Sequence, residues 1–508
     1  MAGGDPHCRF CLVIPVADRP RQLDACLESL QALRRRFPNP RGRLELLLAD
    51  DSADPASIAA HAALAHRHQA GGLAIEHWTP ARQLALLQGL PPPQRALFGA
   101  IDPARPGHKG ASTTRNLALL HLQRRYAGEP RRLLWFIDSD QLFRVNRPGP
   151  TGEEERYAID YFAAWERLFA DPRIEIATGK VVGDPPVSPA VMASTLLEDL
   201  LGLLQALQAR APDAPCGLHP PRAPSIGDAA YHDMADLFGF QAGKRAIPYR
   251  CPLHGPHDQR AALRHLSGRL DGFFDGEHPT RRSHYLPTQG LDMRPARTLY
   301  TGNFVLRASA LRWFIPFAPL RLRMAGPTLG RILRSALGDG FVSVNLPMLH
   351  RRTQADARAE CRPGIERRAA SVDLSGEAQR QFAGDLMLFS VERLIALGWP
   401  QERLTAGEIG IEVEATTARI TRRYGEQRQA IARACERLQG LLQGDDWWQR
   451  DREIRAALEA FSTNLRHNYL EPPPPRGERE LIARIAAAIA DYPAQQRDWG
   501  QLLRALAP

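Results

Sequence analysis

The stretch Leu133-Leu134-Trp135-Phe136-Ile137-Asp138-Ser139-Asp140 places two carboxylates, two residues apart, directly after a run of large apolar side chains. A continuous apolar run of this kind predicts a strand that is buried on both faces of a sheet. Ligands of such sheets bind beyond the carboxyl ends of the strands. Carboxylates there suit a hard divalent cation, which can neutralise a diphosphate as a Lewis acid. Taken alone, such a pair is more often a solvated loop after a buried strand, because short motifs recur by chance.

Strand-like and helix-like patterns alternate along residues 1–182. This alternation predicts an α/β fold with a mixed, mostly parallel sheet and helices on both faces. A second acidic pair, Asp50-Asp51, also follows an apolar run, so both acidic clusters are expected at the ligand-binding edge. The predicted strands are Phe10–Ile14, Leu44–Ala49, Leu73–Trp78, Leu133–Ile137 and Ile174–Thr178. The predicted helices are Leu23–Leu33, Ala56–His68 and Ser112–Tyr126.

The pattern then changes, which divides the chain into four predicted segments. Residues 183–299 are rich in Pro, Gly and His, and we interpret them as an irregular insertion with one strong helix at Val191–Ala209. Strand-like and helix-like signals return over 300–355, including a helix at Pro327–Leu337. Residues 356–508 are predicted to form a helical C-terminal domain. Its expected helices are Gln379–Leu397, Ile409–Leu442, Glu453–Leu465 and Glu478–Ile489.

Four motifs, in their order along the chain, resemble those of the family-2-like GT-A glycosyltransferases. They are Cys11–Asp18 with the following Arg19-Pro20, Leu46–Ser52, Gly107–Asn116, and the Asp138/Asp140 pair. The resemblance covers about residues 9 to 142 and, more weakly, 300 to 353. It implies a GT-A, Rossmann-like fold in which 1–182 bind the nucleotide sugar, 183–299 face the acceptor and 300–355 complete the catalytic domain.

The same resemblance implies an activity and a set of partners. The chain would be a metal-dependent glycosyltransferase, and a hexosyltransferase is the expected kind. It would move a sugar from a nucleoside diphosphate sugar of UDP or GDP type to a hydroxyl acceptor, with Mn²⁺ or Mg²⁺ as cofactor. Sequence alone does not choose the sugar, the base or the acceptor, because loops shape the pocket that selects them.

Individual residues receive roles from this resemblance. Asp138 and Asp140 would hold the metal, and Arg115 would act on the donor from the helix that flanks the sugar. A surface cation on that helix is the alternative interpretation of Arg115. The residues expected to border the nucleotide, its phosphates or its sugar are Pro15, Arg19, Asp50, Asp51, Lys109, Gly110, Asn116, Gly302 and Asn303.

Two features near residue 340 concern the reaction itself. His350 follows an extended run, where some retaining GT-A enzymes have a third metal ligand, and neutral imidazole can complete a carboxylate site for Mn²⁺. Inverting members usually place an acidic pair before the helix that here begins at Pro327, but this chain has Ala325-Gly326. Either another acid serves as catalytic base, with Asp339 the nearest candidate, or the enzyme retains configuration, or activity has been lost. We favour retention.

Two other functional classes are compatible with these motifs. A sugar nucleotidyltransferase usually has a glycine-rich first loop, whereas Pro15–Pro20 contains no glycine. A non-catalytic binding or scaffold protein is supported by the missing acid before Pro327 and opposed by the intact Asp138/Asp140 pair. Binding of UDP, GDP and a nucleoside triphosphate with and without Mn²⁺ separates the three classes.

Composition and charge indicate which kinds of binding partner and which cellular compartment to expect. The net charge is +10, but arginines are scattered without interleaved aromatics, so we expect no nucleic-acid partner. Peripheral contact with a membrane surface stays open. We expect no signal peptide and no transmembrane segment, because the most apolar window, Thr195–Leu207, contains Glu198 and Asp199. Seven cysteines, an odd number in a long chain, favour a reducing compartment, and we predict a cytoplasmic protein.

Cysteine and histidine also form a repeated pattern in the irregular segment. Cys216 and His219 make one Cys-x-x-His pair, and Cys251 and His254 make another. Four such ligands could form a tetrahedral structural Zn²⁺ site, which would stabilise a segment with little core. Chance spacing is the competing interpretation, since histidine is abundant here.

Overall fold

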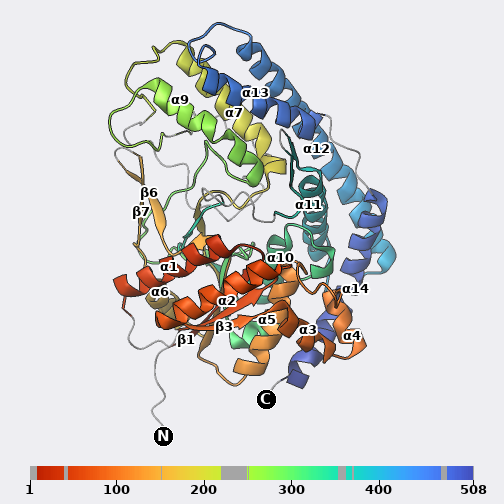
Figure 1. Cartoon of the computed structure of the whole chain (residues 1–508). Helices are drawn as coiled ribbons and strands as arrows, with labels where there is room; N and C mark the ends of the chain where they lie inside the picture. Colours follow the sequence, from red (N-terminus) through yellow and green to blue (C-terminus); the bar gives the residue numbers. More distant parts are fainter. Residues whose placement is uncertain are drawn as a thin grey trace.

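The computed structural model describes residues 8–38, 44–149, 152–218, 249, 251–352, 362–368, 371–470 and 477–506. Within these residues, eight strands form one central sheet (Figure 1). They are β1 (Arg9–Val16), β2 (Leu44–Asp50), β3 (Ala74–Trp78), β4 (Arg132–Ile137), β8 (Ile176–Thr178), β10 (Arg294–Pro295), β11 (Asn303–Arg307) and β12 (Phe341–Ser343). Their order across the sheet is β10-β12-β8-β11-β4-β1-β2-β3.

The sheet is mostly parallel, as the alternating pattern predicts. β1 pairs in parallel with β2 and β4, and β2 with β3. β11 runs antiparallel to both β4 and β8, so β8 and its parallel neighbour β12 share the direction of β4. The carboxyl ends of β1, β2 and β4 therefore meet at one edge, which carries Asp50-Asp51 and Asp138–Asp140.

Helices cover both faces of this sheet because side chains alternate along each buried strand. Leu12 of β1 packs with Leu23 and Trp165 on one face of the sheet, whereas Val13 packs with Leu117 on the opposite face. The helices of the first face are α1 (Pro20–Arg36), α2 (Pro55–Ala70) and α6 (Tyr161–Leu168). Those of the opposite face are α5 (Ala111–Tyr126) and α10 (Ala325–Leu337). Two short helices, α3 (Pro80–Gln88) and α4 (Pro92–Arg95), were not expected from sequence.

Small sheets extend the ligand-binding edge. Three short strands pair in the order β5-β13-β9, and two further pairs of strands form small sheets of their own, of which β6 contacts β9 and β13. The three are β5 (Gln141–Leu142), β9 (Val181–Gly183) and β13 (Met348–His350), and the further pairs are β6 (Val145–Gly149) with β7 (Gly152–Arg156) and β14 (Glu366–Arg367) with β15 (Val372–Asp373). β5 follows the Asp138–Asp140 segment directly, so this sheet joins that segment to the residues around His350.

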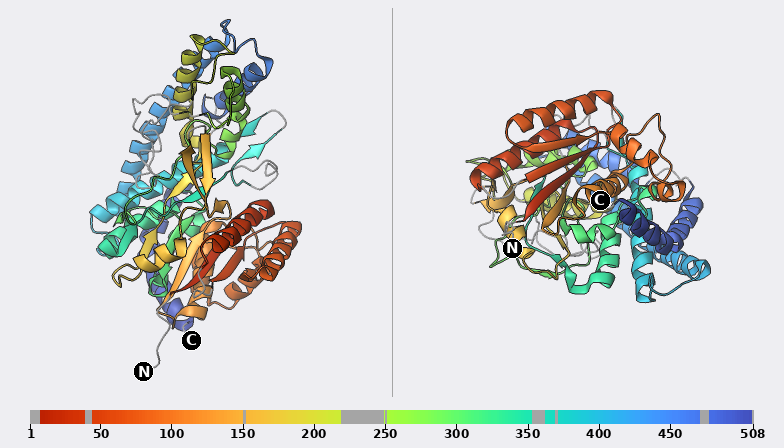
Figure 2. Two further views of the ribbon diagram at one scale, coloured as in Figure 1. Left: turned by 90° about the vertical axis from the view of Figure 1, so that its left-hand side faces the viewer. Right: turned by 90° about the horizontal axis from the view of Figure 1, so that it is seen from below.

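Further helices of the described chain divide between the α5 face of the sheet and a second hydrophobic cluster. They are α7 (Pro189–Gln208), α9 (Gln259–Gly268), α11 (Ser375–Ala396), α12 (Ala406–Leu442), α13 (Arg452–Leu465) and α14 (Glu478–Leu506). α12 begins at a capping box formed by Thr405 and Glu408. It runs from the end of the molecule that holds the sheet toward the end that holds α7, α9 and α13 (Figures 1 and 2). The helical character predicted beyond residue 356 is thus confirmed, whereas α9 was not expected in the irregular segment.

The C-terminal helices take part in two hydrophobic cores. α7, α9, α12 and α13 share one cluster, and α14 joins the cluster on the α5 face of the sheet. In that second cluster Trp499 of α14 donates its indole N–H to the carbonyl oxygen of Leu311 at 3.0 Å. α14 is therefore an integral layer of the α/β region and not a separate tail.

One helix, α7, has the length and composition of a membrane span, but 78% of its apolar window is buried inside the described structure. Asp199 on this helix is buried and accepts hydrogen bonds from Arg281 Nε at 2.7 Å and Thr280 Oγ1 at 2.8 Å. A paired carboxylate in the middle of the helix, packed against α12, agrees with a core helix.

Candidate active site

The centre of the candidate site is Asp140, the second carboxylate after β4. Its side chain is 8% exposed, and Oδ2 lies 3.5 Å from both Arg19 Nη1 and His350 Nε2. Oδ1 is buried and has no hydrogen-bond partner within the described chain. Burial acts to raise the pKa of Asp140, but His350, Arg19 and Arg352 outweigh it and hold the pKa below its usual range. An ionised carboxylate with one orphaned oxygen is the form that a cation ligand requires.

His350 reaches Asp140 through the small sheet. β13 pairs antiparallel with β5, which sets His350 opposite Gln141, and the Arg351 N–H donates to the Asp140 carbonyl at 3.2 Å. The His350 ring is buried, with Nδ1 2.7 Å from the carbonyl oxygen of Asp184. Because that carbonyl can only accept, Nδ1 carries a proton, and Nε2 is the ring nitrogen that faces Asp140. The proximity of His350 to Asp140 expected from sequence is present.

Asp138 lies on the more open side of the pair. Its side chain is 33% exposed, and Oδ1 forms an ion pair with Arg115, whose side chain is 5% exposed on α5. Gly302 fits against the other carboxylate oxygen: a Cβ at this position would lie 2.8 Å from Asp138 Oδ2 and 2.8 Å from the Tyr300 hydroxyl. Gly302 therefore belongs to the site by close approach, because any side chain would push Asp138 aside.

Several arginines lie around this carboxylate pair. Burial lowers the pKa of Arg352, as do the neighbouring charges of Arg323 and Arg19, while Asp140 raises it. Burial likewise lowers the pKa of Arg362, where Asp275 opposes the shift and Arg19 and Arg352 add to it. Arg352 Nε is buried without a hydrogen-bond partner in the described chain. Such a concentration of cations, incompletely satisfied by the protein, suits an anionic ligand.

Protein groups enclose Asp50 completely, which corrects its assignment as a nucleotide-binding residue. It is completely buried, with Oδ2 3.0 Å from His61 Nδ1 and 2.8 Å from His77 Nε2. The Ser52 N–H donates to Oδ1 at 2.9 Å. Burial acts to raise the pKa of Asp50, but these partners hold it far below its usual range. Its role is to fix the end of β2.

Asp51 and Lys109 bind each other. Lys109 Nζ lies 2.6 Å from Asp51 Oδ1, and the side chain of Lys109 is only 2% exposed. The backbone N–H groups of Lys109 and Gly110 each donate to the Asp51 carboxylate at 3.0 Å. Lys109 is thus neutralised inside the protein and does not supply charge to a phosphate, contrary to the sequence expectation. Together these residues hold the loop before α5, where Gly110 has φ +98°.

Asn116 and Asn303 are also structural residues, which corrects their assignment to substrate binding. The Asn116 side chain donates to the Ile315 carbonyl at 2.9 Å and accepts from its N–H at 2.8 Å. Asn303 is completely buried. Its amide donates to the carbonyls of Lys180 and Leu346, and its oxygen accepts from the Trp135 indole at 3.0 Å. Pro15 is buried within β1.

Asp339 lies too far from Asp138 and Asp140 to act as the catalytic base of a reaction at that site. It lies in the turn before β12, and β12 runs in the direction of β4, so Asp339 is at the opposite edge of the sheet. Its side chain is 94% exposed and is 3.5 Å from Arg334. The sequence expectation was wrong because a residue that precedes a parallel strand lies at the amino edge.

Residues that the sequence did not indicate complete the site. Asp184 orients His350 through its carbonyl and accepts the Arg352 N–H at 3.0 Å through its carboxylate. Gln141 Nε2 donates to the Tyr300 hydroxyl at 2.5 Å, which fixes the ring that abuts Gly302. The only available sequence signal was the position of Gln141, directly after Asp138–Asp140.

The Cys-His pattern forms a different cluster from the one expected. His254 is exposed, and His219 lies outside the described residues. The histidine beside Cys216 and Cys251 is instead His257.

Comparison with known proteins adds two structures of low similarity. No protein-family model matches the chain, and no curated protein sequence matches it. A mannosyltransferase from Pyrobaculum calidifontis, solved with GDP-Man and Mn²⁺, is 11% identical, with coverage of 96% of this chain and 87% of that chain and a TM-score of 0.33. A mannosyl-3-phosphoglycerate synthase from Rubrobacter xylanophilus is 11% identical, with coverage of 68% of each chain and a TM-score of 0.28. Similarity this low does not establish a family, so any function has to be argued from the site.

Proposed function

We propose that this chain is a metal-dependent glycosyltransferase that moves a hexose from a nucleoside diphosphate sugar of UDP or GDP type to a hydroxyl acceptor. One observation carries the proposal. Asp140 Oδ1, which has no hydrogen-bond partner in the described chain, and His350 Nε2 lie together at the carboxyl edge of the sheet, beside Asp138 and several arginines.

The donor set fits Mn²⁺ or Mg²⁺. Carboxylate oxygens suit both ions, and an imidazole nitrogen beside them favours Mn²⁺ over Mg²⁺. Asp140 and His350 would hold the ion, with Asp138 contributing from the open side. When bound, the ion would neutralise the charge of the donor diphosphate. The Asp184 carbonyl would keep the His350 ring in the tautomer that leaves Nε2 free to bind.

The arginines would act on the same diphosphate as it leaves the sugar. Arg115 lies against Asp138, and Arg19 lies 3.5 Å from Asp140, so both guanidinium groups face the space next to the proposed ion. Fixed cations that already point at a developing negative charge lower the barrier without reorganising during the reaction. Arg352, buried with an unpartnered Nε, supports the same role.

We also propose that the sugar keeps its anomeric configuration. An inverting reaction needs a base on the acceptor side, and the residue that sequence offered, Asp339, lies at the other edge of the sheet. The presence of His350 beside Asp140 agrees with retention. NMR analysis of the anomeric proton in the first product tests this point, and an inverted product would contradict it.

Calorimetric titration tests the function as a whole. UDP, GDP, their hexose derivatives and a nucleoside triphosphate are titrated with Mn²⁺ and again with excess chelator, and slow hydrolysis of the sugar nucleotide is followed in parallel. We expect a diphosphate to bind more tightly with metal, because its charge otherwise repels Asp138 and Asp140. Preference for the triphosphate with release of pyrophosphate would indicate a nucleotidyltransferase. Binding without hydrolysis or transfer to any acceptor would indicate a non-catalytic protein.

A further inference from the structure

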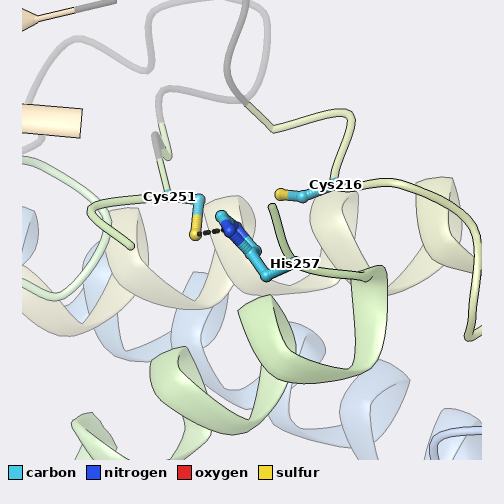
Figure 3. Close-up of side chains that lie close together, drawn as sticks. All are labelled: Cys216, Cys251 and His257. Atoms are coloured by element: carbon cyan, nitrogen blue, oxygen red, sulfur yellow. Dashed lines mark hydrogen bonds between the residues drawn. The ribbon is translucent and has the colours of Figure 1, made fainter. Parts of the chain in front are cut away.

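A second group of metal-ligand side chains lies away from the candidate active site. Cys216, Cys251 and His257 each point one ligand atom toward the others, and these atoms lie within 4.8 Å of one another (Figure 3). Cys251 Sγ is 3.2 Å from His257 Nε2. Cys251 is completely buried, and Cys216 and His257 are half-buried. Neither cysteine forms a disulfide.

The imidazole ring is already oriented for a soft cation. His257 Nδ1 lies 2.8 Å from the carbonyl oxygen of Gly255, which can only accept a hydrogen bond. Nδ1 therefore carries the proton, and the lone pair of Nε2 faces the two sulfur atoms. A backbone carbonyl that fixes the tautomer of a histidine is the usual support of a zinc ligand. The turn that places this carbonyl requires φ +78° at Gly255, a conformation that glycine adopts without strain.

Backbone hydrogen bonds also hold the three ligands in position. The Cys216 N–H donates to the His257 carbonyl at 3.0 Å, and the Cys251 N–H donates to the Leu218 carbonyl at 3.1 Å. The Gln259 N–H donates to the Ala214 carbonyl at 3.0 Å in the same arrangement. Two chain segments that are distant in sequence are thus aligned, and the side chains they contribute converge on one point.

We propose that Cys216, Cys251 and His257 bind a structural Zn²⁺ ion that joins the segment after α7 to the segment before α9. Two thiolates and an imidazole select zinc over the oxygen-preferring Mn²⁺ or Mg²⁺, so this site differs in chemistry from the one at Asp140. Around tetrahedral zinc such atoms are about 3.5 to 3.8 Å apart. The widest spacing of 4.8 Å therefore needs to close by about 1 Å, whereas the Cys251–His257 distance of 3.2 Å needs to open slightly. Water or a further protein group completes the coordination.

The position of the ion explains what it would stabilise. His257 precedes Asp258, whose side chain caps α9 by accepting the Ala261 N–H at 2.7 Å. α9 packs with α7 and α13 in one hydrophobic cluster. Fixing the first turn of α9 to the segment after α7 would close this cluster in a region with few regular elements.

Metal analysis of the purified chain tests the proposal. Protein prepared under reducing conditions should contain about one zinc ion per chain when measured by inductively coupled plasma mass spectrometry. Cys251→Ser and His257→Ala should lose it and melt at lower temperature. Two matched controls should keep it: His254→Ala, an exposed histidine of the same loop, and Cys435→Ser, a buried free thiol elsewhere.

Cobalt substitution gives a second readout that needs no variant. Wild-type protein stripped with a chelator and refilled with Co²⁺ should show a thiolate-to-cobalt charge-transfer band and intense tetrahedral d–d bands. Absence of zinc together with absence of these bands would overturn the proposal. A Cys216–Cys251 disulfide that persists in protein purified under reducing conditions would overturn it as well. Loss of zinc in Asp140→Asn, with retention in His257→Ala, would assign the ion to the other site.

Discussion

Replacing Gly302 by alanine tests the metal site without removing a proposed ligand. A Cβ at this residue would lie 2.8 Å from Asp138 Oδ2, whereas ordinary contacts begin at 3.4 Å. The backbone of Gly302 has no positive φ, so alanine adds steric pressure and no backbone strain. Asp138 would have to retreat by about 0.6 Å, beyond the roughly 0.2 Å that metal–ligand distances tolerate. We expect the Kd for Mn²⁺ to rise about 10- to 100-fold, or about 1.4 to 2.7 kcal/mol.

The assay is calorimetric titration of Mn²⁺ into the protein with a nucleoside diphosphate present. Gly128→Ala is the matched control, because a Cβ at Gly128 meets nothing within 4 Å. Gly128→Ala should melt at the wild-type temperature, and Gly302→Ala, whose Cβ also meets the buried Tyr300 ring, should melt somewhat lower but keep the wild-type circular dichroism spectrum, which separates a local effect from unfolding. A Gly302→Ala protein that binds Mn²⁺ with wild-type affinity would refute the reasoning that places the ion against Asp138.

Three further predictions address the chemistry and the stability of the chain. Asp138→Asn or Asp140→Asn should abolish turnover with an unchanged circular dichroism spectrum, because an amide cannot replace carboxylate charge on a hard cation; full activity in both would remove the metal assignment. Asn303→Ala should lower the free energy of unfolding in urea by about 2 to 5 kcal/mol, since it strands buried partners. If Asn303→Ala instead raises the KM for the donor and leaves the stability unchanged, Asn303 would be a substrate-binding residue. Burial raises the pKa of Asp385 to about 7 from an ordinary 3.8, so the folded chain keeps a proton that the unfolded chain releases. The free energy of unfolding should therefore fall as the pH rises from about 4 to about 7, and Asp385→Asn should flatten that slope; parallel wild-type and variant curves would contradict this.

Strands β1, β2 and β4 of the large sheet were predictable because each is mostly an apolar run, whereas β10, the dipeptide Arg294-Pro295, was not expected. β1, β2 and β4 are buried on both faces, so their sequences contain almost no polar residue to obscure the pattern. Their common direction followed from the helices between them, and with it the edge where Asp138 and Asp140 lie. This much of the site was a consequence of topology.

The partners of the acidic residues were not predictable from local pattern. Asp50 and Asp138 both follow buried strands, yet Asp50 is enclosed by His61 and His77 while Asp138 is partly exposed. Only packing between distant segments decides which carboxylate faces solvent. His350 reaches Asp140 through strands of two and three residues, which are too short to give a periodic signal.

Regular spacing also misled the choice of histidine. The pairs Cys216/His219 and Cys251/His254 share the same interval, which suggested four equivalent ligands. In the structure the turn at Gly255 directs His254 outward and brings His257 back toward Cys251. A reversal that depends on one positive φ cannot be inferred from residue intervals.

The place of Trp499 has a consequence for how the chain is made. Its ring lies 6.3 Å from that of Phe98 and 5.2 Å from that of Phe314, so the last helix completes a core begun by the first strands. On the ribosome the sheet is therefore synthesised long before one of its covering layers, and part of its α5 face stays exposed to water until α14 has been made. Until α14 is synthesised, the nascent chain stays in a partly folded form that exposes apolar surface. Intermediates of this kind are bound by chaperones. We therefore expect a chain that stops before Glu478 to aggregate instead of folding into a shorter, less stable protein.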